Sequence, residues 1–268
     1  HGAQVAVLSS LAKLTCLGTD PTTARLSFQE FFGRAVDSKT WGYPAAALLG
    51  SIDAQIAMGT ASIGGKDSMS GTFEKINVPH TLVSFAVGHD EIENITSGSF
   101  KKADSNIYLV QVPYSEELAP DFDSFTKNAK ALVELNKAGK IHSMYPVCAG
   151  GVAEALTKMA LGNKIGCEIN FIPASATAIN IKKTPEKTSS AKKKTVEQEI
   201  AAIKEGTPFD LFTPLYGTII VETDSSIEND PRFASGTVAK IGKTVKAQTI
   251  TVTGKTKAST VVIKLDDA

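Results

Sequence analysis

Helical and extended patterns alternate along this chain in two groups, and this alternation restricts the fold more than any other sequence feature. Apolar residues recur with helical spacing in several segments, and short runs rich in β-branched residues lie between them. We expect helices at residues 4–17, 28–32, 43–58, 122–138, 152–161 and 197–204. We expect strands at residues 81–87, 107–112, 141–147, 165–171, 216–222, 234–241, 249–253 and 260–265. Mixed helices and strands in two groups predict an α+β fold.

A polar stretch at residues 89–105 separates the two groups and is typical of a connection between domains. We therefore place a first domain at residues 1–97 and a second at residues 98–268. Within the second domain, residues 181–195 form a Lys-rich loop. An anion or RNA patch is one interpretation of this loop. A solvated loop is favoured, because no aromatic residues lie between the lysines to stack on bases.

The charge balance limits the classes of partner. Lys and Arg number 28, and so do Asp and Glu, so the formal net charge is zero. A zero net charge argues against general binding of nucleic acid or of an anionic membrane. No apolar run reaches the roughly 20 residues that a membrane-spanning helix needs. With three cysteines and no secretory leader, we expect a cytoplasmic protein. The chain starts at His1 without Met, so we expect either a processed product or a piece of a longer protein.

The strongest local signal for chemistry is the string Gly-Gly-Lys-Asp-Ser-Met-Ser-Gly at residues 64–71. Adjacent glycines let backbone N–H groups approach an anion, a lysine supplies a positive charge, and hydroxyl groups bind phosphate oxygens. The string is not a P-loop, because Gly59 and Gly65 are one residue too far apart and Asp67 stands where Ser or Thr belongs. Phosphate binding and a plain β-turn both remain open. In the binding interpretation, Asp67 holds a metal or orients Lys66.

A second candidate is the string Cys-Ala-Gly-Gly at residues 148–151, between a predicted strand and a predicted helix. A helix N-terminus lowers the pKa of a neighbouring thiol, so Cys148 could act as a nucleophile with His142 as its base. A glutaminase-type nucleophile has Gly two residues before the Cys, and here Pro146 occupies that position. The alternative, which we favour, is a small buried thiol beside glycines that allow close packing.

Several of these strings together resemble one enzyme family. They are residues 27–32 (Ser-Phe-Gln-Glu-Phe-Phe), Trp41-Gly42, residues 63–70 (Ile-Gly-Gly-Lys-Asp-Ser-Met-Ser), residues 147–155 and residues 158–166. The chain is similar in these strings to phosphoribosylformylglycinamidine synthase, also called formylglycinamide ribonucleotide amidotransferase. The resemblance implies a ligase of purine biosynthesis that uses formylglycinamide ribonucleotide, glutamine and ATP with Mg²⁺. It covers nearly the whole chain but only part of that enzyme.

The resemblance also implies an architecture. Two aminoimidazole ribonucleotide synthetase-like units form the body of this family, each with a ferredoxin-like N-terminal domain and an α/β C-terminal domain. This chain resembles a partial second ferredoxin-like domain followed by the second C-terminal domain. We therefore expect a fragment that is inactive alone and depends on missing domains for substrate, ATP and glutamine-derived ammonia. The truncated first domain could also self-associate through an open sheet edge.

The family's ATP and substrate cleft maps onto the glycine-rich string. The residues carried over are Gly64, Gly65, Lys66, Asp67 and Ser68, with Ser68 the expected substrate contact. No catalytic residue and no metal ligand is assigned. Lys66 stands where some relatives place an Asn that holds magnesium, which argues against a metal role at that position. The implied chemistry is phosphorylation of the formyl amide oxygen, after which ammonia displaces phosphate.

An auxiliary ADP bound by many large members of the family is expected to be absent here. Those members carry His-Asp-x-Ser-Asp-Gly-Gly before a helix, whereas residues 145–151 read Tyr-Pro-Val-Cys-Ala-Gly-Gly. Pro146 and Cys148 therefore replace two ligands. Ser9 and Lys13 replace a Glu and an Asn of the first helix. These four departures point in the same direction.

Three other functions compete with the ligase fragment. The first is a stand-alone nucleotide-binding or kinase-like member of the same superfamily, which needs acidic magnesium ligands of its own near Gly65. Only Asp67 and Glu74 lie there in the sequence. The second is a Cys-dependent amidohydrolase centred on Cys148. The third is a structural domain with a decayed site.

Overall fold

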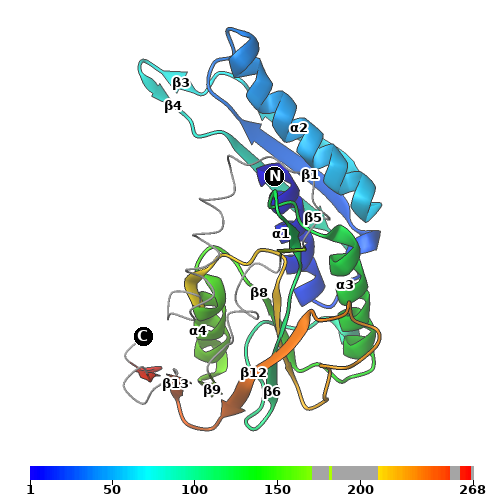
Figure 1. Cartoon of the computed structure of the whole chain (residues 1–268), viewed down its shortest axis with the longest axis vertical. Helices are drawn as coiled ribbons and strands as arrows, with labels where there is room; N and C mark the ends of the chain where they lie inside the picture. The colour runs from blue at the N-terminus through cyan, green and yellow to red at the C-terminus, as the bar shows by residue number, and fades with distance from the viewer. Residues whose placement is uncertain (171–180, 183–210, 254–259, 267–268) are drawn as a thin grey trace.

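The computed structural model describes residues 1–170, 181–182, 211–253 and 260–266 (Figure 1). The N-terminal elements are α1 (Gly2–Cys16), β1 (Arg25–Phe31), α2 (Ser38–Met58), β2 (Ser62–Ser68), β3 (Thr72–Phe73), β4 (Ile76–Asn77) and β5 (Thr81–Val87), with 3₁₀ helices at Pro21–Thr23 and Ile92–Asn94. They are followed by β6 (Asn106–Val110), β7 (Tyr114–Ser115), α3 (Phe122–Lys137), β8 (Ser143–Pro146), α4 (Gly151–Asn163), β9 (Gly166–Ile169), β10 (Ile181–Lys182), β11 (Ile219–Thr223), β12 (Val238–Val245), β13 (Thr249–Val252) and β14 (Val261–Lys264). Helices and strands mix as an α+β fold requires.

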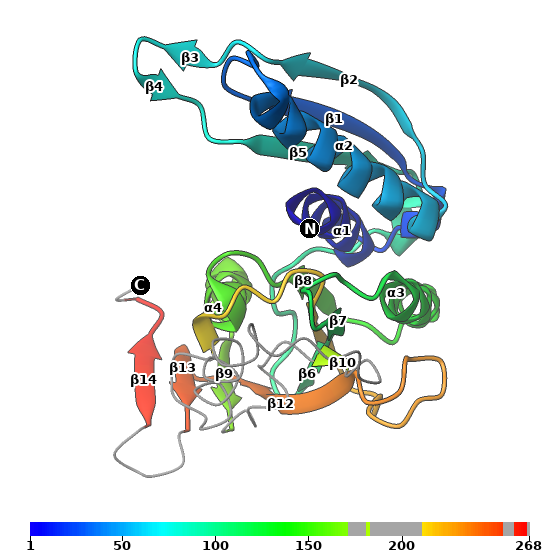
Figure 2. The same cartoon turned by 45° about the horizontal axis from the view of Figure 1, so that its top comes forward.

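A three-stranded sheet in the order β2-β1-β5 forms the N-terminal part, with β1 parallel to β2 and antiparallel to β5. Figure 2 shows α2 along one face of this sheet. The predicted helix at residues 28–32 was wrong, since these residues belong almost entirely to β1. Ser27 followed by Glu30 imitates a helix start, but Leu26 and Phe28 alternate onto the core side with the period of a strand. Whether this domain is ferredoxin-like stays a prediction.

Helix α2 begins five residues earlier than its pattern predicted, because Asp37 and Thr40 form a capping box. The Asp37 carboxylate accepts from the Thr40 N–H at 2.8 Å. Pro44 therefore lies inside the helix. The C-terminus was predicted correctly, and Gly59 ends the helix with φ of 64°. Helix α2 connects β1 to β2 and thereby sets these two strands parallel.

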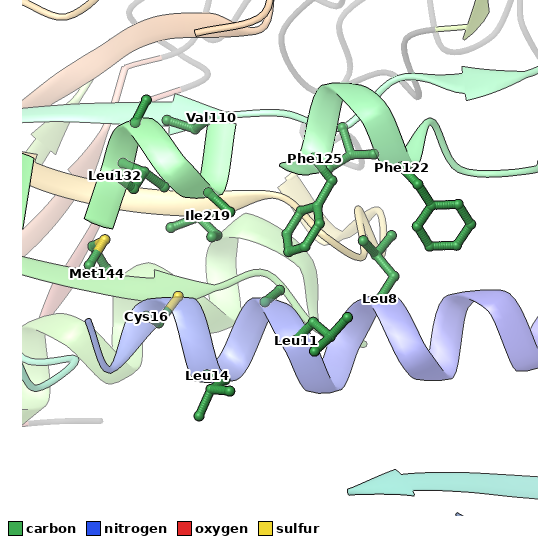
Figure 3. Packing of buried hydrophobic residues seen from close by; sticks show 14 of the residues in the cluster. Leu8, Leu11, Leu14, Cys16, Val110, Phe122, Phe125, Leu132, Met144 and Ile219 are labelled. Atoms are coloured by element: carbon green, nitrogen blue, oxygen red, sulfur yellow. The ribbon is translucent and has the colours of Figure 1, made fainter. Parts of the chain in front are cut away.

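Helix α1 is buried on several sides and joins the two parts of the molecule. It packs on α2 and β5, and also on β8 and α3 of the C-terminal part. Figure 3 shows Leu8 and Leu11 facing Phe125, whereas Leu14 points away from them. The side chain of Leu14 lies beside Gly88, just after β5. One hydrophobic cluster therefore contains residues from both predicted domains.

A seven-stranded sheet in the order β14-β13-β9-β12-β6-β11-β8 forms the C-terminal part. Its central strands β6 and β11 are buried on both faces. Tyr108 and Val110 belong to the cluster that contains α1 and α3, whereas Ile107 and Leu109 belong to a second cluster that contains α4. Successive side chains of a strand point to opposite faces, so the two clusters lie on opposite faces of the sheet.

The other predicted elements of this part agree with the structure to within a few residues. The expected helix at 197–204 lies outside the described residues, and so does the Lys-rich loop at 181–195 apart from β10. Strand β10 pairs in parallel with β7. No helix in the described part of the chain is both long and apolar enough to cross a membrane.

Candidate functional site

The residues predicted to bind ATP and substrate all lie on strand β2, at the edge of the three-stranded sheet. Gly64, Gly65, Lys66 and Asp67 are exposed, and Ser68 is half-buried. The segment is therefore an extended edge strand up to Ser68, where the sequence suggested a loop or turn. An edge strand has backbone N–H groups that no neighbouring strand uses, and these remain available to a ligand.

Gly65 is needed for the close approach of β2 to β1. A Cβ atom on Gly65 would lie 2.5 Å from the Phe28 carbonyl oxygen, which is closer than two such atoms can come. A Cβ atom on Gly64 would meet nothing within 4 Å. The Gln55 side chain, near the end of α2, fixes the start of the strand by accepting from the Ser62 N–H at 2.8 Å. Strand pairing thus explains the second glycine of the pair without reference to a ligand.

The pairing of β2 with β1 divides the predicted site between two faces. Lys66 pairs with Gln29 and Ser68 pairs with Phe31, and these side chains point to the open face of the sheet. The Lys66 Nζ lies 5.6 Å from the centroid of the Phe31 ring, which is cation–π contact distance. Asp67 points to the opposite face. A ligand that lies along the edge of β2 can reach both faces.

Glu30 joins Asp67 on the face that α2 covers, and sequence reasoning missed its place at the site. The two residues are direct neighbours in the β1–β2 pairing. Glu30 is only 6% exposed. Burial, and secondarily the charge of Asp67, raise the pKa of the Glu30 carboxyl. Glu30 belongs to the string at residues 27–32 that resembles the enzyme family. Because this string was predicted to be a helix, the sequence could not indicate that Glu30 pairs with Asp67 across a sheet.

These two carboxylates are the groups of this edge that could hold a divalent cation, because Mg²⁺ prefers oxygen ligands. Within the described ranges, His, Cys, Asp and Glu form no group of three or more able to hold a metal. The remaining ligands of a magnesium ion here would therefore be phosphate oxygens and water.

The second candidate, Cys148, lacks the environment of an activated thiol. It is free and half-buried, and burial raises its pKa. An activated nucleophile needs the opposite shift. His142, the proposed base, lies with its Nε2 3.1 Å from the Asp224 carboxylate. These observations favour the interpretation of Cys148 as a packing residue.

An aromatic group lies near the C-terminal end of β1. The His80 ring stacks on Tyr43 at 4.1 Å between centroids and on Phe32 at 5.5 Å. The Trp41 side chain does not join this group and is 55% exposed. Trp41 lies in the first turn of α2, where one side of the helix faces outward.

Among the curated relatives that match part of the sequence, two are phosphoribosylformylglycinamidine synthase subunit PurL. The protein of Thermococcus sibiricus is 25% identical over 192 residues, which are 65% of this chain and 27% of the relative. The protein of Methanobrevibacter smithii is 26% identical over 129 residues, which are 41% of this chain and 18% of the relative. The chain thus spans about a quarter or less of these relatives. No family model matches the sequence.

Solved structures share the fold over almost the whole chain. T. maritima PurL complexed with ATP has a TM-score of 0.63 at 12% identity, and the match covers 98% of this chain and 40% of that one. The hydrogenase maturation protein HypE of E. coli has a TM-score of 0.67 at 11% identity, with 99% of this chain and 80% of HypE covered. The chain therefore has the fold that these PurL and HypE structures share.

Proposed function

We propose that this chain is part of an ATP-dependent carbon–nitrogen ligase of the phosphoribosylformylglycinamidine synthase type. Such an enzyme converts formylglycinamide ribonucleotide, ATP and glutamine-derived ammonia to formylglycinamidine ribonucleotide. The fold also suits a stand-alone relative, because the chain spans four fifths of E. coli HypE. The sequence relatives support the ligase, since both are PurL subunits.

The observation that carries the proposal is the arrangement of charges along the free edge of β2. Lys66 and Ser68 lie on the open face, and Asp67 lies beside the buried Glu30 on the other. A nucleoside triphosphate needs a positive charge and hydroxyl or N–H donors for its phosphate oxygens, together with carboxylates for the accompanying cation. The edge of β2 carries all of these groups within five consecutive residues and one neighbour on β1.

In the proposed reaction the formyl amide oxygen attacks the γ-phosphorus of ATP, and ADP leaves. Ammonia then adds to the amide carbon that carries the phosphorylated oxygen, and the bond between this carbon and that oxygen breaks, so that phosphate departs. The Lys66 ammonium group and the Ser68 hydroxyl bind phosphoryl oxygens, where negative charge develops. A bound magnesium ion would neutralise phosphate charge and would be held by Asp67 with Glu30. These two residues fit a cation, since the Glu30 side chain is largely buried and pairs across the two strands with a second carboxylate.

The test is ammonia-dependent ligation by the intact polypeptide that contains this chain. Lys66→Ala and Ser68→Ala are expected to lower kcat by about 10²-fold each, as the loss of one stabilising donor does in other enzymes. Lys75→Ala is the matched control, because Lys75 is an exposed lysine in the turn of the β3–β4 hairpin, beyond β2. Its turnover should equal that of the unchanged enzyme.

Two results would contradict the proposal in different ways. Full activity of the Ser68→Ala and Lys66→Ala enzymes would remove the site assignment. Ligation of formylglycinamide ribonucleotide by the isolated 268-residue chain would show that no further domains are needed. It would contradict the proposal that the chain is only part of the ligase. ATP consumption without ligation by the isolated chain would favour the kinase-like alternative.

A further inference from the structure

A second group of charged side chains gathers where α4 begins, away from the edge of β2. We call it the α4 charge cluster and define it as Lys13 of α1 with Glu154 and Lys158 of α4. The Gly150 N–H donates to Glu154 Oε2 at 2.7 Å. The Lys158 ammonium group donates to the other oxygen, Glu154 Oε1. One carboxylate therefore binds both the start of its own helix and a neighbouring cation.

Both lysines of the cluster act electrostatically on Cys148, which lies just before the start of α4. Burial raises the pKa of Cys148, and the positive charges of Lys13 and Lys158 oppose that rise. Lys158 is matched by its ion pair with Glu154. The same contacts, from Lys158 and from the Gly150 N–H, hold the pKa of Glu154 below its ordinary value. Glu154 is thus an ionised carboxylate held between the start of its own helix and the Lys158 ammonium group.

This is the place where the family resemblance implies an auxiliary ADP, and the residues present do not fit one. A phosphate at a helix start needs free N–H groups and unpaired positive charge. Glu154 already takes the Gly150 N–H and neutralises Lys158. Its side chain also folds back onto Gly150, so closely that a Cβ atom on Gly150 would lie 2.6 Å from Glu154 Cβ. A phosphate would have to displace this carboxylate.

We propose that Glu154 is a built-in anion that replaces a ligand phosphate at the start of α4. The chain then holds this helix end in place without a bound nucleotide. Removing the carboxylate frees the Lys158 ammonium group and the Gly150 N–H, which can then bind an inorganic phosphate group. Lys13, whose charge acts on Cys148 just before the start of α4, adds positive charge to this region. This inference concerns α4 alone and is independent of the reaction proposed at β2.

The test uses inorganic phosphate and the full 268-residue chain. Glu154→Ala is expected to lower the Tm by about 2–4 °C, because it removes a helix-capping hydrogen bond and an ion pair. Millimolar phosphate should restore the Tm of Glu154→Ala and should not alter the Tm of the unchanged chain. Adding Lys13→Ala to Glu154→Ala should weaken the restoration. NMR shifts of the Gly150 and Gly151 amides locate the bound phosphate.

Asp121→Ala is the matched control. Asp121 caps α3 by accepting from the Ser124 N–H at 3.0 Å, so its loss lowers the Tm without vacating the α4 charge cluster. Phosphate should not restore this variant. The proposal is overturned if the Gly150 amide of the unchanged chain shifts on addition of millimolar phosphate or ADP. That measurement needs only the unchanged chain if the variant fails to fold. Absence of any phosphate response in folded Glu154→Ala overturns the proposal as well.

Discussion

The two sheets of this molecule differ in how they are covered. The central strands of the seven-stranded sheet carry buried side chains on both faces, packed on α1 and α3 on one side and on α4 on the other. The three-stranded sheet has α1 and α2 on one face only. On its other face Phe85 and Val87 are exposed by 46% and 66%. The central strands of the first sheet are therefore enclosed on both faces, whereas the second sheet is covered on one face.

The difference separates stability from function. Apolar area removed from water supplies most of the stabilising free energy, so the enclosed sheet dominates folding. The residues of the candidate site lie instead on the sheet that is open, at its free edge. Helix α1 connects the two, and its Ser10 hydroxyl lies 2.8 Å from the Ser84 hydroxyl of β5. The seven-stranded sheet thus holds the three-stranded sheet in place through α1.

The largest effect is expected from a substitution in the enclosed sheet. Leu109 is fully buried in the cluster around α4. Leu109→Ala should lower the free energy of unfolding by about 2–5 kcal/mol, as lost contacts and a residual cavity do in other cores. Val87→Ala on the open face should change it by less than about 0.5 kcal/mol. Urea unfolding followed by circular dichroism measures both, and similar losses for the two variants would contradict the comparison.

The enclosed part of the fold was largely predictable from sequence, whereas the open sheet was predictable only in part. The strand predicted at residues 81–87 matches β5, but β1 was predicted as a helix and β2 was missed. Helix α3 follows a clear amphipathic pattern, starts at an Asp cap and ends before Gly139, so local signals determine its limits. Strand β1 is seven residues long, and its pattern is decided by what packs on Leu26 and Phe28. A local helix-start signal therefore outweighed a pattern that only tertiary contacts define.

The candidate site shows the same limit. Residues 64–68 were recognisable as a unit from their glycines, lysine and hydroxyl group. Their division between two faces, and the approach of Glu30 to Asp67, depend on the parallel pairing that α2 imposes on β1 and β2. A β-strand, helix, β-strand reading of residues 25–68 would have predicted this pairing. The missed strand is therefore the reason that Glu30 was missed.

The sequence led us to expect self-association through an open sheet edge, and we propose that the exposed apolar face beside the free edge of β5 contributes to this contact. Exposed apolar side chains on a sheet with free edges are typical of an association surface. Phe85→Lys should raise the dissociation constant of the self-associated form at least tenfold, which corresponds to about 1.4 kcal/mol. Sedimentation velocity over a concentration series measures this change.

Phe73→Lys is the control for that experiment, because Phe73 is 74% exposed on the β3–β4 hairpin and does not belong to the open face. It should leave the dissociation constant unchanged. An unchanged chain that stays monomeric at all concentrations, or an equal effect of both variants, would remove the open face as the contact surface.

The smallest effect is a difference in how acid acts on the two sheets. Burial and Asp67 raise the pKa of Glu30 in the open sheet, so its ionised form destabilises the fold. Glu30→Gln should therefore raise the Tm at neutral pH, and this gain should vanish as the pH falls through the raised pKa to the ordinary value of 4.5. At the end of β11, the Lys102 ammonium group and His142 lower the pKa of Asp224 to about 2.

Asp224→Asn should lower the Tm at neutral pH, and this loss should vanish between the ordinary pKa of 3.8 and a pH of about 2. The change in Asp224→Asn stays small, since Asp224 and Lys102 are half-exposed and water screens their interaction. Thermal unfolding from neutral pH to pH 2, without divalent cations, measures the effects of both variants. The two variants should depart from the unchanged chain in opposite directions at neutral pH. A gain from Asp224→Asn, or a loss from Glu30→Gln, would show that packing and not ionisation decides the effect.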